Sequence, residues 1–368
     1  MRVLHFFKTY IPDNFAGIER VIYQLAEGCA ERGIRSDVLS LSRNADTLEN
    51  PMQVGSHFAY KAKLDLYVAS TGFSISGFKS FAELAREADI VHYQFPWPYM
   101  DMAHFAVRHG KPTVLSYHSD IVRQKFLRPF YAPLMHCFLG SVDRIVASSP
   151  KYVESSPVLA RYRDKTSVIP IGLPHEKADA VDPALVEKWR ARVGEGFFLF
   201  VGVLRYYKGL TFLAEAARKT GLPVVVVGEG ELQAELEASG LPNLKLVGAV
   251  SDADRAALLH LSRVFVFPSH LRSESFGVAL LEAARAGRAM ISCEIGTGTS
   301  YVNADGETGI VVAPASSDAL ADAMVAMHGN HELTERMGRA AHERFRNIFS
   351  SDAMVESYIS IYRELLSK

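Results

Sequence analysis

Two glutamates eight residues apart, Glu274 and Glu282, surround a turn that opens an apolar helical pattern. The residues after the first glutamate are Ser275-Phe276-Gly277-Val278. Ionised carboxylates are hydrogen-bond acceptors and each accepts bonds from two hydroxyls. Eight helical residues span roughly 12 Å, about the reach from the hexose to the ribose hydroxyls of a nucleotide-sugar. The spacing therefore predicts a hydroxyl-binding clamp. The alternative is two solvated glutamates near a helix start, where negative charge is favourable.

A pair of cations follows the apolar run that ends at Val201. The segment reads Gly202-Val203-Leu204-Arg205-Tyr206-Tyr207-Lys208-Gly209. A guanidinium presents a planar fork and an ammonium a point charge, and both suit a diphosphate. We predict that Arg205 and Lys208 bind phosphate. The alternative for either is a solvated surface charge, the commonest state of Arg and Lys.

Glycines and a histidine follow other apolar runs. Gly17 begins a helical pattern after the first run, so the backbone can approach an anion closely at a helix N-terminus. No Gly-x-Gly-x-x-Gly occurs at this turn, which argues against a nicotinamide dehydrogenase. Gly228 and Glu229 end another run, where small residues admit a ligand. His118 follows 113–117, and a lone histidine there is more often structural than a catalytic base.

Aromatic and basic residues stand out in the first half. Trp97 and Tyr99 follow the run at 90–93, and their rings could stack on a sugar or cap the core. Residues 123–131 mix cations with large apolar side chains. Such a segment could lie on an anionic bilayer, although a solvated helix with one buried face is the more common explanation.

Apolar runs alternate with helical patterns along the whole chain, which predicts an α/β fold of parallel β-α-β units. Helices are expected over 18–32 and 78–87. The expected strands are 3–7, 36–41, 90–93, 113–117, 144–148 and 167–169, then 197–201, 224–227, 244–246, 264–267, 289–292 and 310–312. In open sheets of this kind, ligands bind beyond the carboxyl ends of strands. Most of the polar residues above stand at such ends.

Two Rossmann-like domains account for the alternation. We predict a first domain over 1–172 and a second over 173–351, with the hinge in the polar stretch from Gly172 to about Gly196. Segment 352–368 carries apolar residues at three-to-four-residue spacing. It is therefore predicted to be an amphipathic helix that covers a surface.

The composition is that of an ordinary globular protein, with 368 residues and a formal net charge of −1. The length favours two domains, and the charge argues against a dedicated nucleic-acid binder. Residues 1–180 carry 21 Lys and Arg against 18 Asp and Glu, a mild excess that suits an anionic acceptor or membrane face. No run approaches the roughly 20 apolar residues of a membrane span, and the three cysteines lack metal-ligand spacing. We expect a soluble, cytoplasmic protein.

Six motifs, in order along the chain, resemble those of the family-4 retaining glycosyltransferases, which have the two-domain GT-B fold. They are Gly17-Ile18-Glu19-Arg20, Tyr117-His118-Ser119-Asp120, Val201 through Gly209, Val227-Gly228-Glu229-Gly230, Glu274 through Glu282, and Asp305-Gly306-Glu307-Thr308-Gly309. The resemblance covers most of the chain. It implies two Rossmann-like domains facing a central cleft, with an acceptor site in the first half, a donor site in the second, and a terminal helix that returns to the first domain.

The resemblance also implies roles for individual residues. Arg205 and Lys208 stabilise the departing nucleoside diphosphate without metal, an electrostatic task. The family places an arginine directly after the glycine, where this chain has Val203. Because side chains alternate in an extended segment, Arg205 projects to the same side and takes that role. His118 lies beside the donor sugar and positions a hydroxyl.

The remaining implied contacts are to the donor. Glu274 and Glu282 form the clamp, and Ser275, Phe276, Gly277 and Val278 line it. Gly17, Gly228 and Glu229 approach the donor, and Val250 belongs to the loop that reads the nucleobase. Trp97 and Tyr99 are the weaker acceptor-side candidates.

Residues 4–10 together with 296–303 look like bacterial mannosyl- and rhamnosyltransferases of surface-polysaccharide assembly. That similarity favours a GDP-sugar donor and a glycan or lipid-linked saccharide acceptor, in lipopolysaccharide or related polysaccharide biosynthesis. It also suggests peripheral contact with the inner face of the cell membrane. No cofactor or metal is expected.

Two other functions remain open. An epimerase of GT-B fold would share the architecture but needs carboxylate acid-base groups, for which Asp13, Glu19 and Asp120 are the early candidates. A non-catalytic nucleotide-sugar binding protein would keep the glutamate clamp alone.

Overall fold

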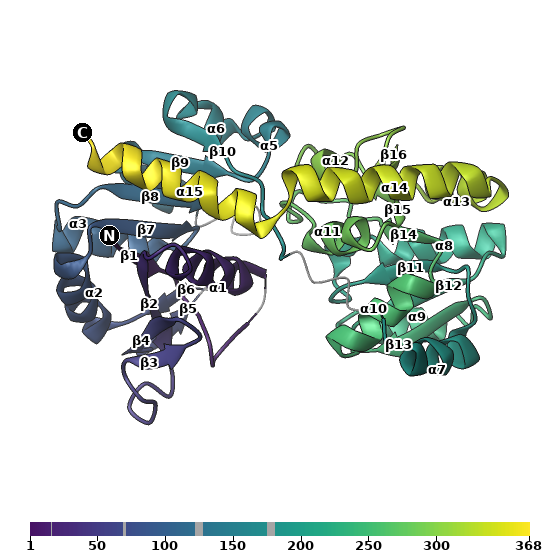
Figure 1. Cartoon of the computed structure of the whole chain (residues 1–368), viewed down its shortest axis with the longest axis horizontal. Helices are drawn as coiled ribbons and strands as arrows, with labels where there is room; N and C mark the ends of the chain where they lie inside the picture. Colours follow the sequence, from purple (N-terminus) through teal and green to yellow (C-terminus); the bar gives the residue numbers. More distant parts are fainter. Residues whose placement is uncertain (16, 69–70, 122–127, 175–180) are drawn as a thin grey trace. The chain divides into compact units, whose positions relative to one another are not determined.

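The computed structural model describes residues 1–15, 17–68, 71–121, 128–174 and 181–368. The chain forms two compact units, one of Met1–Gly172 with Ser351–Lys368 and one of Leu173–Ser350 (Figure 1). Each unit has its own parallel sheet and its own apolar core. Residues 123–127 of the segment predicted to contact a membrane lie outside the described residues.

The first unit contains an eight-stranded sheet in the order β10-β9-β8-β7-β1-β2-β4-β3. Neighbouring strands are parallel except β3 and β4. The bounds are β1 Arg2–Phe6, β2 Arg35–Ser42, β3 Met52–Val54, β4 His57–Lys63, β7 Ile90–Phe95, β8 Thr113–Tyr117, β9 Arg144–Ala147 and β10 Thr166–Val168. A separate antiparallel hairpin joins β5 Leu66–Val68 to β6 Thr71–Phe73. The central strands are buried along their length because helices cover both faces of a parallel sheet.

Helices surround this sheet. They are α1 Gly17–Ala30, α2 Ile75–Glu87, α3 Pro98–Val107, α4 Arg128–Ser141, α5 Pro150–Ser155, α6 Pro157–Ala160 and α15 Ser351–Leu366, with a 3-10 turn at Arg163–Lys165. The last helix packs beside α1 (Figure 1). It buries Met354, Tyr358, Ile361 and Leu365, the apolar face that the sequence predicts.

The second unit contains a six-stranded parallel sheet in the order β13-β12-β11-β14-β15-β16. Its strands are β11 Phe198–Val201, β12 Val224–Val227, β13 Leu244–Gly248, β14 Val264–Phe267, β15 Ala289–Cys293 and β16 Gly309–Val312. Its helices are α7 Pro183–Val193, α8 Leu210–Thr220, α9 Gln233–Ala238, α10 Asp252–Leu261, α11 Val278–Arg285, α12 Thr299–Val302, α13 Ser317–Gly329 and α14 His331–Ile348, with a 3-10 turn at Tyr206–Lys208. Counted within the unit, the strand order is 3-2-1-4-5-6, so the order reverses between β11 and β14.

The predicted α/β fold with two Rossmann-like sheets is confirmed, and every predicted strand is present within a residue or two of its expected bounds. Strands β3 to β6 were not predicted because three of them are three residues long and β4 carries the polar residues His57 and Lys61. The polar stretch before Gly196 also holds a helix, α7. Asp182 caps it by accepting a hydrogen bond from the amide of Ala184, 2.9 Å away.

Candidate functional site

An ion pair lies at the point where the strand order of the second unit reverses. Strands β11 and β14 pair directly, so the loops that follow them are neighbours. The first loop carries Lys208 and the second carries Glu274, and Lys208 Nζ is 2.5 Å from Glu274 Oε2. The ammonium also lies 4.6 Å from the ring centroid of Phe267. Because ligands of open α/β sheets bind at this point, the pair marks the candidate site.

The two loops can approach each other only because residue 209 is glycine. Gly209 has a φ of +71°, and a Cβ there would lie 2.0 Å from the carbonyl oxygen of Pro268. A side chain would therefore push the loop after β11 away from the loop after β14. The glycine fixes the position of Lys208, which precedes it.

The alternation predicted for the segment after β11 is present. Val203 and Arg205 are exposed, and Leu204 between them is buried. Arg205 forms no ion pair with any residue that the structure describes, so its guanidinium remains available to an anion. The arrangement supports Arg205 as the residue that replaces the family's usual arginine.

Glu282 lies one turn into α11 and is held by a neighbouring helix. Arg255 of α10 places a guanidinium nitrogen 3.1 Å from Glu282 Oε1, and the same nitrogen is 3.1 Å from Asp252. Only Glu282 of the two clamp residues is helical, because α11 begins at Val278 after Gly277, whose φ is +88°. The helical rise over eight residues therefore does not give the separation of the two carboxylates.

The residues between the glutamates have different surroundings. Phe276 is 2 % exposed and packs edge to face against Phe349, with ring centroids 6.2 Å apart. Its ring therefore belongs to the core of the second unit, and a donor contact at this residue stays a prediction. Ser275 and Val278 are partly exposed, and the Ser275 carbonyl accepts a bond from Gly298.

Gly228 is required for packing within the protein. Its φ is +129°, and a Cβ would lie 2.0 Å from the carbonyl oxygen of Gly202. The backbone at Gly228 therefore lies close to the loop after β11. The side chain of the next residue, Glu229, is exposed. The glycine lets the loop after β12 pack against the loop after β11.

The loop after β13 leads into α10. Val250 is partly exposed, and Ser251 caps the helix by accepting a bond from the amide of Asp254. The chain carries an Asp-x-Asp triplet here, 252–254. Hydrogen bonds from Ser251 and Trp189 lower the pKa of Asp254 to about 2, and Asp252 is paired with Arg255. Both carboxylates have local structural partners.

His118 lies at the carboxyl end of β8 in the first unit. Its Nε2 is 2.7 Å from the Oε1 of Gln94, so Nε2–H donates and Nδ1 can accept a bond from a ligand. Burial, with a smaller contribution from the charge of Lys8, lowers the pKa of His118 to about 4. The imidazole is neutral at pH 7, as suits a residue that orients a hydroxyl. Gly17, the other first-unit candidate, is the first residue of α1 and has open space around its Cα.

Trp97 and Tyr99 are core residues, which corrects their prediction as acceptor contacts. Each is 1 % exposed. Trp97 Nε1 donates to the carbonyl of Gly72, and the Tyr99 hydroxyl donates to the carbonyl of Ser74. Neither ring presents a face to a sugar.

The three carboxylates considered for acid-base chemistry all have structural partners. Asp13 pairs with Lys61 at 3.0 Å. Glu19 accepts bonds from Thr9 and Asn14, and Asp120 accepts bonds from the hydroxyls of Tyr117 and Ser156. These bonds fix loops of the first unit, so the arrangement gives no support to an epimerase.

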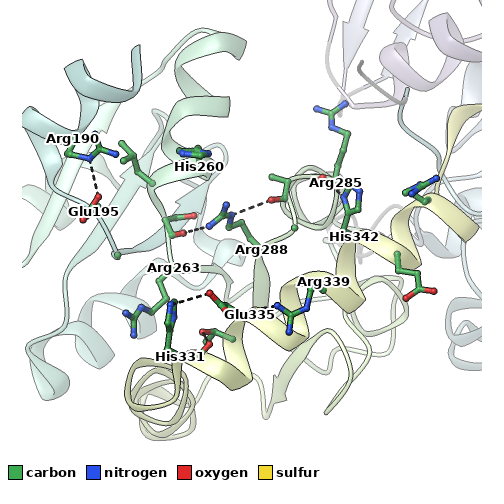
Figure 2. Close-up of a pocket in the computed structure, with 18 of the residues that line it drawn as sticks. Arg190, Glu195, His260, Arg263, Arg285, Arg288, His331, Glu335, Arg339 and His342 are labelled. Carbon is green, nitrogen blue, oxygen red and sulfur yellow. Dashed lines mark hydrogen bonds and ion pairs between the residues drawn. The ribbon is translucent and has the colours of Figure 1, made fainter. Parts of the chain in front are cut away.

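A cavity of about 1240 Å³ in the second unit contains none of the predicted site residues. It lies by the amino ends of β14 and β15, where Arg263 and Arg288 precede the strands. Figure 2 shows its arginines and histidines, with Arg190 paired to Glu195 and His331 to Glu335. Ligands of open α/β sheets bind at the opposite edge. The cavity is therefore not the candidate site.

The described ranges contain no group of three or more His, Cys, Asp or Glu residues arranged to hold a metal ion. Within the same ranges, no helix is both long and apolar enough to cross a membrane.

The two parallel-sheet units define a two-domain α/β protein of GT-B type. Residues 15–177 match the family described as Glycosyltransferase Family 4, and residues 182–344 match Glycosyl transferases group 1. The chain belongs to the family-4 glycosyltransferases, as its motifs predict.

Known relatives are similar over almost their whole length. The D-rhamnosyltransferase WbpZ of Pseudomonas aeruginosa is 52% identical over 355 residues, 95% of this chain and 93% of the relative. The O-antigen chain mannosyltransferase C of Escherichia coli is 48% identical over 370 residues, 100% of this chain and 99% of the relative. The crystal structure of HepE from Anabaena in complex with UDP has a TM-score of 0.78 at 15% identity, covering 99% of this chain and all of that one. The predicted similarity to mannosyl- and rhamnosyltransferases is confirmed.

Proposed function

We propose that the protein is a retaining hexosyltransferase of polysaccharide biosynthesis. It transfers mannose or rhamnose from a nucleoside-diphosphate sugar, with GDP favoured, to a glycan or lipid-linked saccharide. The observation that carries the proposal is the Lys208–Glu274 pair at the strand-order reversal of the second unit. The names of the two relatives support the transferred sugar and the O-antigen type of product.

Lys208 and Arg205 supply the charge that the leaving diphosphate needs. When a donor binds, Lys208 exchanges part of its contact with Glu274 for phosphate oxygens, and Glu274 then accepts bonds from sugar hydroxyls. Glu282, oriented by Arg255, accepts bonds from the ribose. Neutral His118 positions a hydroxyl through Nδ1. No chain carboxylate is needed as a base, because the acceptor proton passes to the departing phosphate on the same face of the sugar.

The transferred sugar is expected to keep its anomeric configuration. An inverting enzyme needs a base within hydrogen-bond reach of the acceptor hydroxyl, opposite the leaving group, and Asp13, Glu19 and Asp120 are bound to structural partners. Proton NMR of freshly formed product from an α-linked donor should show an α-linkage, and a β-linked first product would refute the mechanism. The same spectra with donor alone test the alternatives, because an epimerase changes the donor sugar and a binding protein leaves it intact.

GDP is expected to raise the melting temperature more than equal concentrations of UDP or ADP, because a ligand that binds the native state stabilises it by mass action. A larger shift with UDP, the nucleotide in the HepE structure, would show that the donor is a UDP-sugar.

Glu282→Ala should reduce the shift of the melting temperature with every nucleotide, because loss of a charged acceptor for the ribose hydroxyls weakens binding by roughly 1.5 to 3 kcal/mol. An undiminished shift in Glu282→Ala would show that Glu282 does not bind the nucleotide.

Transfer is expected to continue in the presence of EDTA, because Arg205 and Lys208 provide the positive charge on the diphosphate. Initial rates with and without chelator measure this directly. Complete loss of activity that magnesium or manganese restores would show that a divalent ion supplies this charge instead.

A cytoplasmic location with peripheral contact to an anionic membrane stays a prediction.

A further inference from the structure

A cavity of about 350 Å³ lies in the first unit at the carboxyl ends of β1 and β2. Lys8 and Thr9 follow β1, Arg43 follows β2, and Tyr67 comes from the β5–β6 hairpin. The position obeys the rule that ligands of open α/β sheets bind beyond the carboxyl ends of strands. None of the residues predicted from the sequence to bind donor or acceptor lines this cavity.

Among the described residues that line the cavity, Asp13 is the one acidic residue, and Lys61 neutralises its charge. Lys61 Nζ lies 3.0 Å from Asp13 Oδ2, and the Ser42 hydroxyl donates a hydrogen bond of 2.7 Å to Asp13. Lys61 is 3 % exposed, and its ammonium also donates to the carbonyl of Tyr10 and the hydroxyl of Ser40. This buried ion pair holds the wall in place and leaves Asp13 with no uncompensated charge.

Two cations in the wall have no carboxylate partner among the described residues. They are Lys8 and Arg43, and no ion pair within 4 Å involves either. Lys8 is partly buried, which lowers the pKa of its ammonium, although the negative charge of Glu19 opposes this effect. Arg43 is exposed at the rim. The cavity wall therefore offers two cationic side chains that no carboxylate pairs with directly, which suits a phosphate monoester with its charge of roughly −1.5 to −2 at neutral pH.

The rest of the wall suits a sugar. The hydroxyl of Thr9 donates to Glu19, so its oxygen is left as an acceptor for a ligand hydroxyl. Tyr67 is 53 % exposed and offers an aromatic face on which a sugar ring can stack. Its hairpin neighbours Leu66 and Val68 are also more than half exposed, and they would suit an apolar substituent.

We propose that this cavity selects the acceptor, a saccharide that bears a phosphate or diphosphate, with Lys8 and Arg43 on the phosphate and Tyr67 against the sugar ring. The inference rests on the proposed transferase function and deepens it by naming the substrate class. The phosphate belongs either to a free sugar phosphate or to the headgroup of a lipid-linked saccharide. The two sources share this recognition and differ only in the apolar substituent.

The test uses one acceptor saccharide in three forms: the free sugar, its 1-diphosphate, and the same diphosphate esterified with a short alkyl chain. The measured quantity is the preference, the ratio of kcat/KM for a phosphorylated form to that for the free sugar. Arg43→Ala should lower this preference about tenfold to a hundredfold, the effect of losing one charged hydrogen bond, and Arg43→Lys should restore part of it. The matched control is Arg86→Ala, an exposed arginine of α2 outside the cavity, which should keep the wild-type preference.

The outcomes separate this inference from the proposed function. An unchanged preference in Arg43→Ala, or a wild type that prefers the free sugar, overturns the phosphate site while transfer itself persists. Absence of transfer to any acceptor by the wild type overturns the proposed function instead. Calorimetry of the sugar phosphate then tests the cavity directly, because binding that Arg43→Ala weakens still supports the site. Tighter binding of the alkyl diphosphate than of the 1-diphosphate without the alkyl chain identifies a lipid-linked source, and equal binding identifies a free sugar phosphate.

Discussion

Lys208→Ala is expected to lower kcat for sugar transfer about a hundredfold to a thousandfold. The ammonium is the cation at the strand-order reversal that is already engaged with a carboxylate, Glu274. In the transition state the diphosphate gains negative charge as the glycosidic bond breaks. Removing one preorganised donor from such a developing charge costs about 2.7 to 4 kcal/mol. Initial rates at saturating donor and acceptor measure the loss.

Lys245→Ala is the matched control for this variant. Lys245 is an exposed lysine of β13 in the same unit, so its removal should leave kcat close to that of the wild type. Melting temperatures of both variants check that the fold survives. A folded Lys208→Ala enzyme with near-normal kcat would show that the ion pair with Glu274 is structural. Arg205 would then be the residue that stabilises the charge of the leaving diphosphate.

The central strands could be predicted from the sequence because they are buried on both faces. Val224 to Val227 is an unbroken apolar run, and the structure makes it β12, a fully buried strand. The β5–β6 hairpin gives no such signal, since Leu66, Tyr67 and Val68 are exposed and pair with only one short strand. Apolar residues there have no periodic burial from which a strand could be inferred.

The sequence was sufficient to predict which loops of the second unit form the candidate site. Because parallel strands end at one edge, the positions of Lys208 and Glu274 after two strands place them at the same edge of the sheet. Their direct contact was not predictable, because it depends on β11 pairing with β14, a tertiary choice. The tight packing of Gly209 on Pro268 follows from the same pairing.

The first-unit site was predicted less well because aromatic residues after a strand can either bind ligands or fill the core. Trp97 and Tyr99 find hydrogen-bond partners inside the unit and are buried. Lys8 and Arg43, which line the cavity instead, carried a usable signal: each is a cation within two residues of a strand end. That Asp13 does not cancel their charge depends on Lys61, which lies on the unpredicted strand β4.

The histidines of the first unit predict a loss of stability in mild acid. His5 is fully buried, and neither of its ring nitrogens has a hydrogen-bond partner among the residues that the structure describes. The centroid of its ring lies 5.0 Å from that of His92. Burial lowers the pKa of His5 to about 3 and that of His92 well below its usual value. Both stay neutral in the folded protein at pH 5, whereas in the unfolded chain a histidine with a pKa near 6.5 is largely protonated.

Between pH 6.5 and about 4 the unfolded chain therefore binds more protons, so stability rises with pH and is lost as the pH falls through this window. Each fully buried imidazole contributes about 2 kcal/mol to the loss between pH 7 and pH 5. Burial raises the pKa of Asp101, so this carboxyl changes stability with pH in the opposite direction to the histidines. The total change in stability therefore does not give the contribution of the histidines alone. Comparison of the wild type with His5→Phe gives the contribution of His5, because the variant removes one imidazole and keeps an aromatic ring of similar size.

We expect the wild-type melting temperature to fall by several degrees from pH 7 to pH 5, and to fall less in His5→Phe. His260→Gln, a change at an exposed histidine of the second unit, is the control and should fall as far as the wild type. The expectation fails if His5→Phe and the wild type lose equal stability over this range. That result would mean that His5 accepts a proton in the folded state at pH 5, which requires water or an anion to reach the space between β1 and β7.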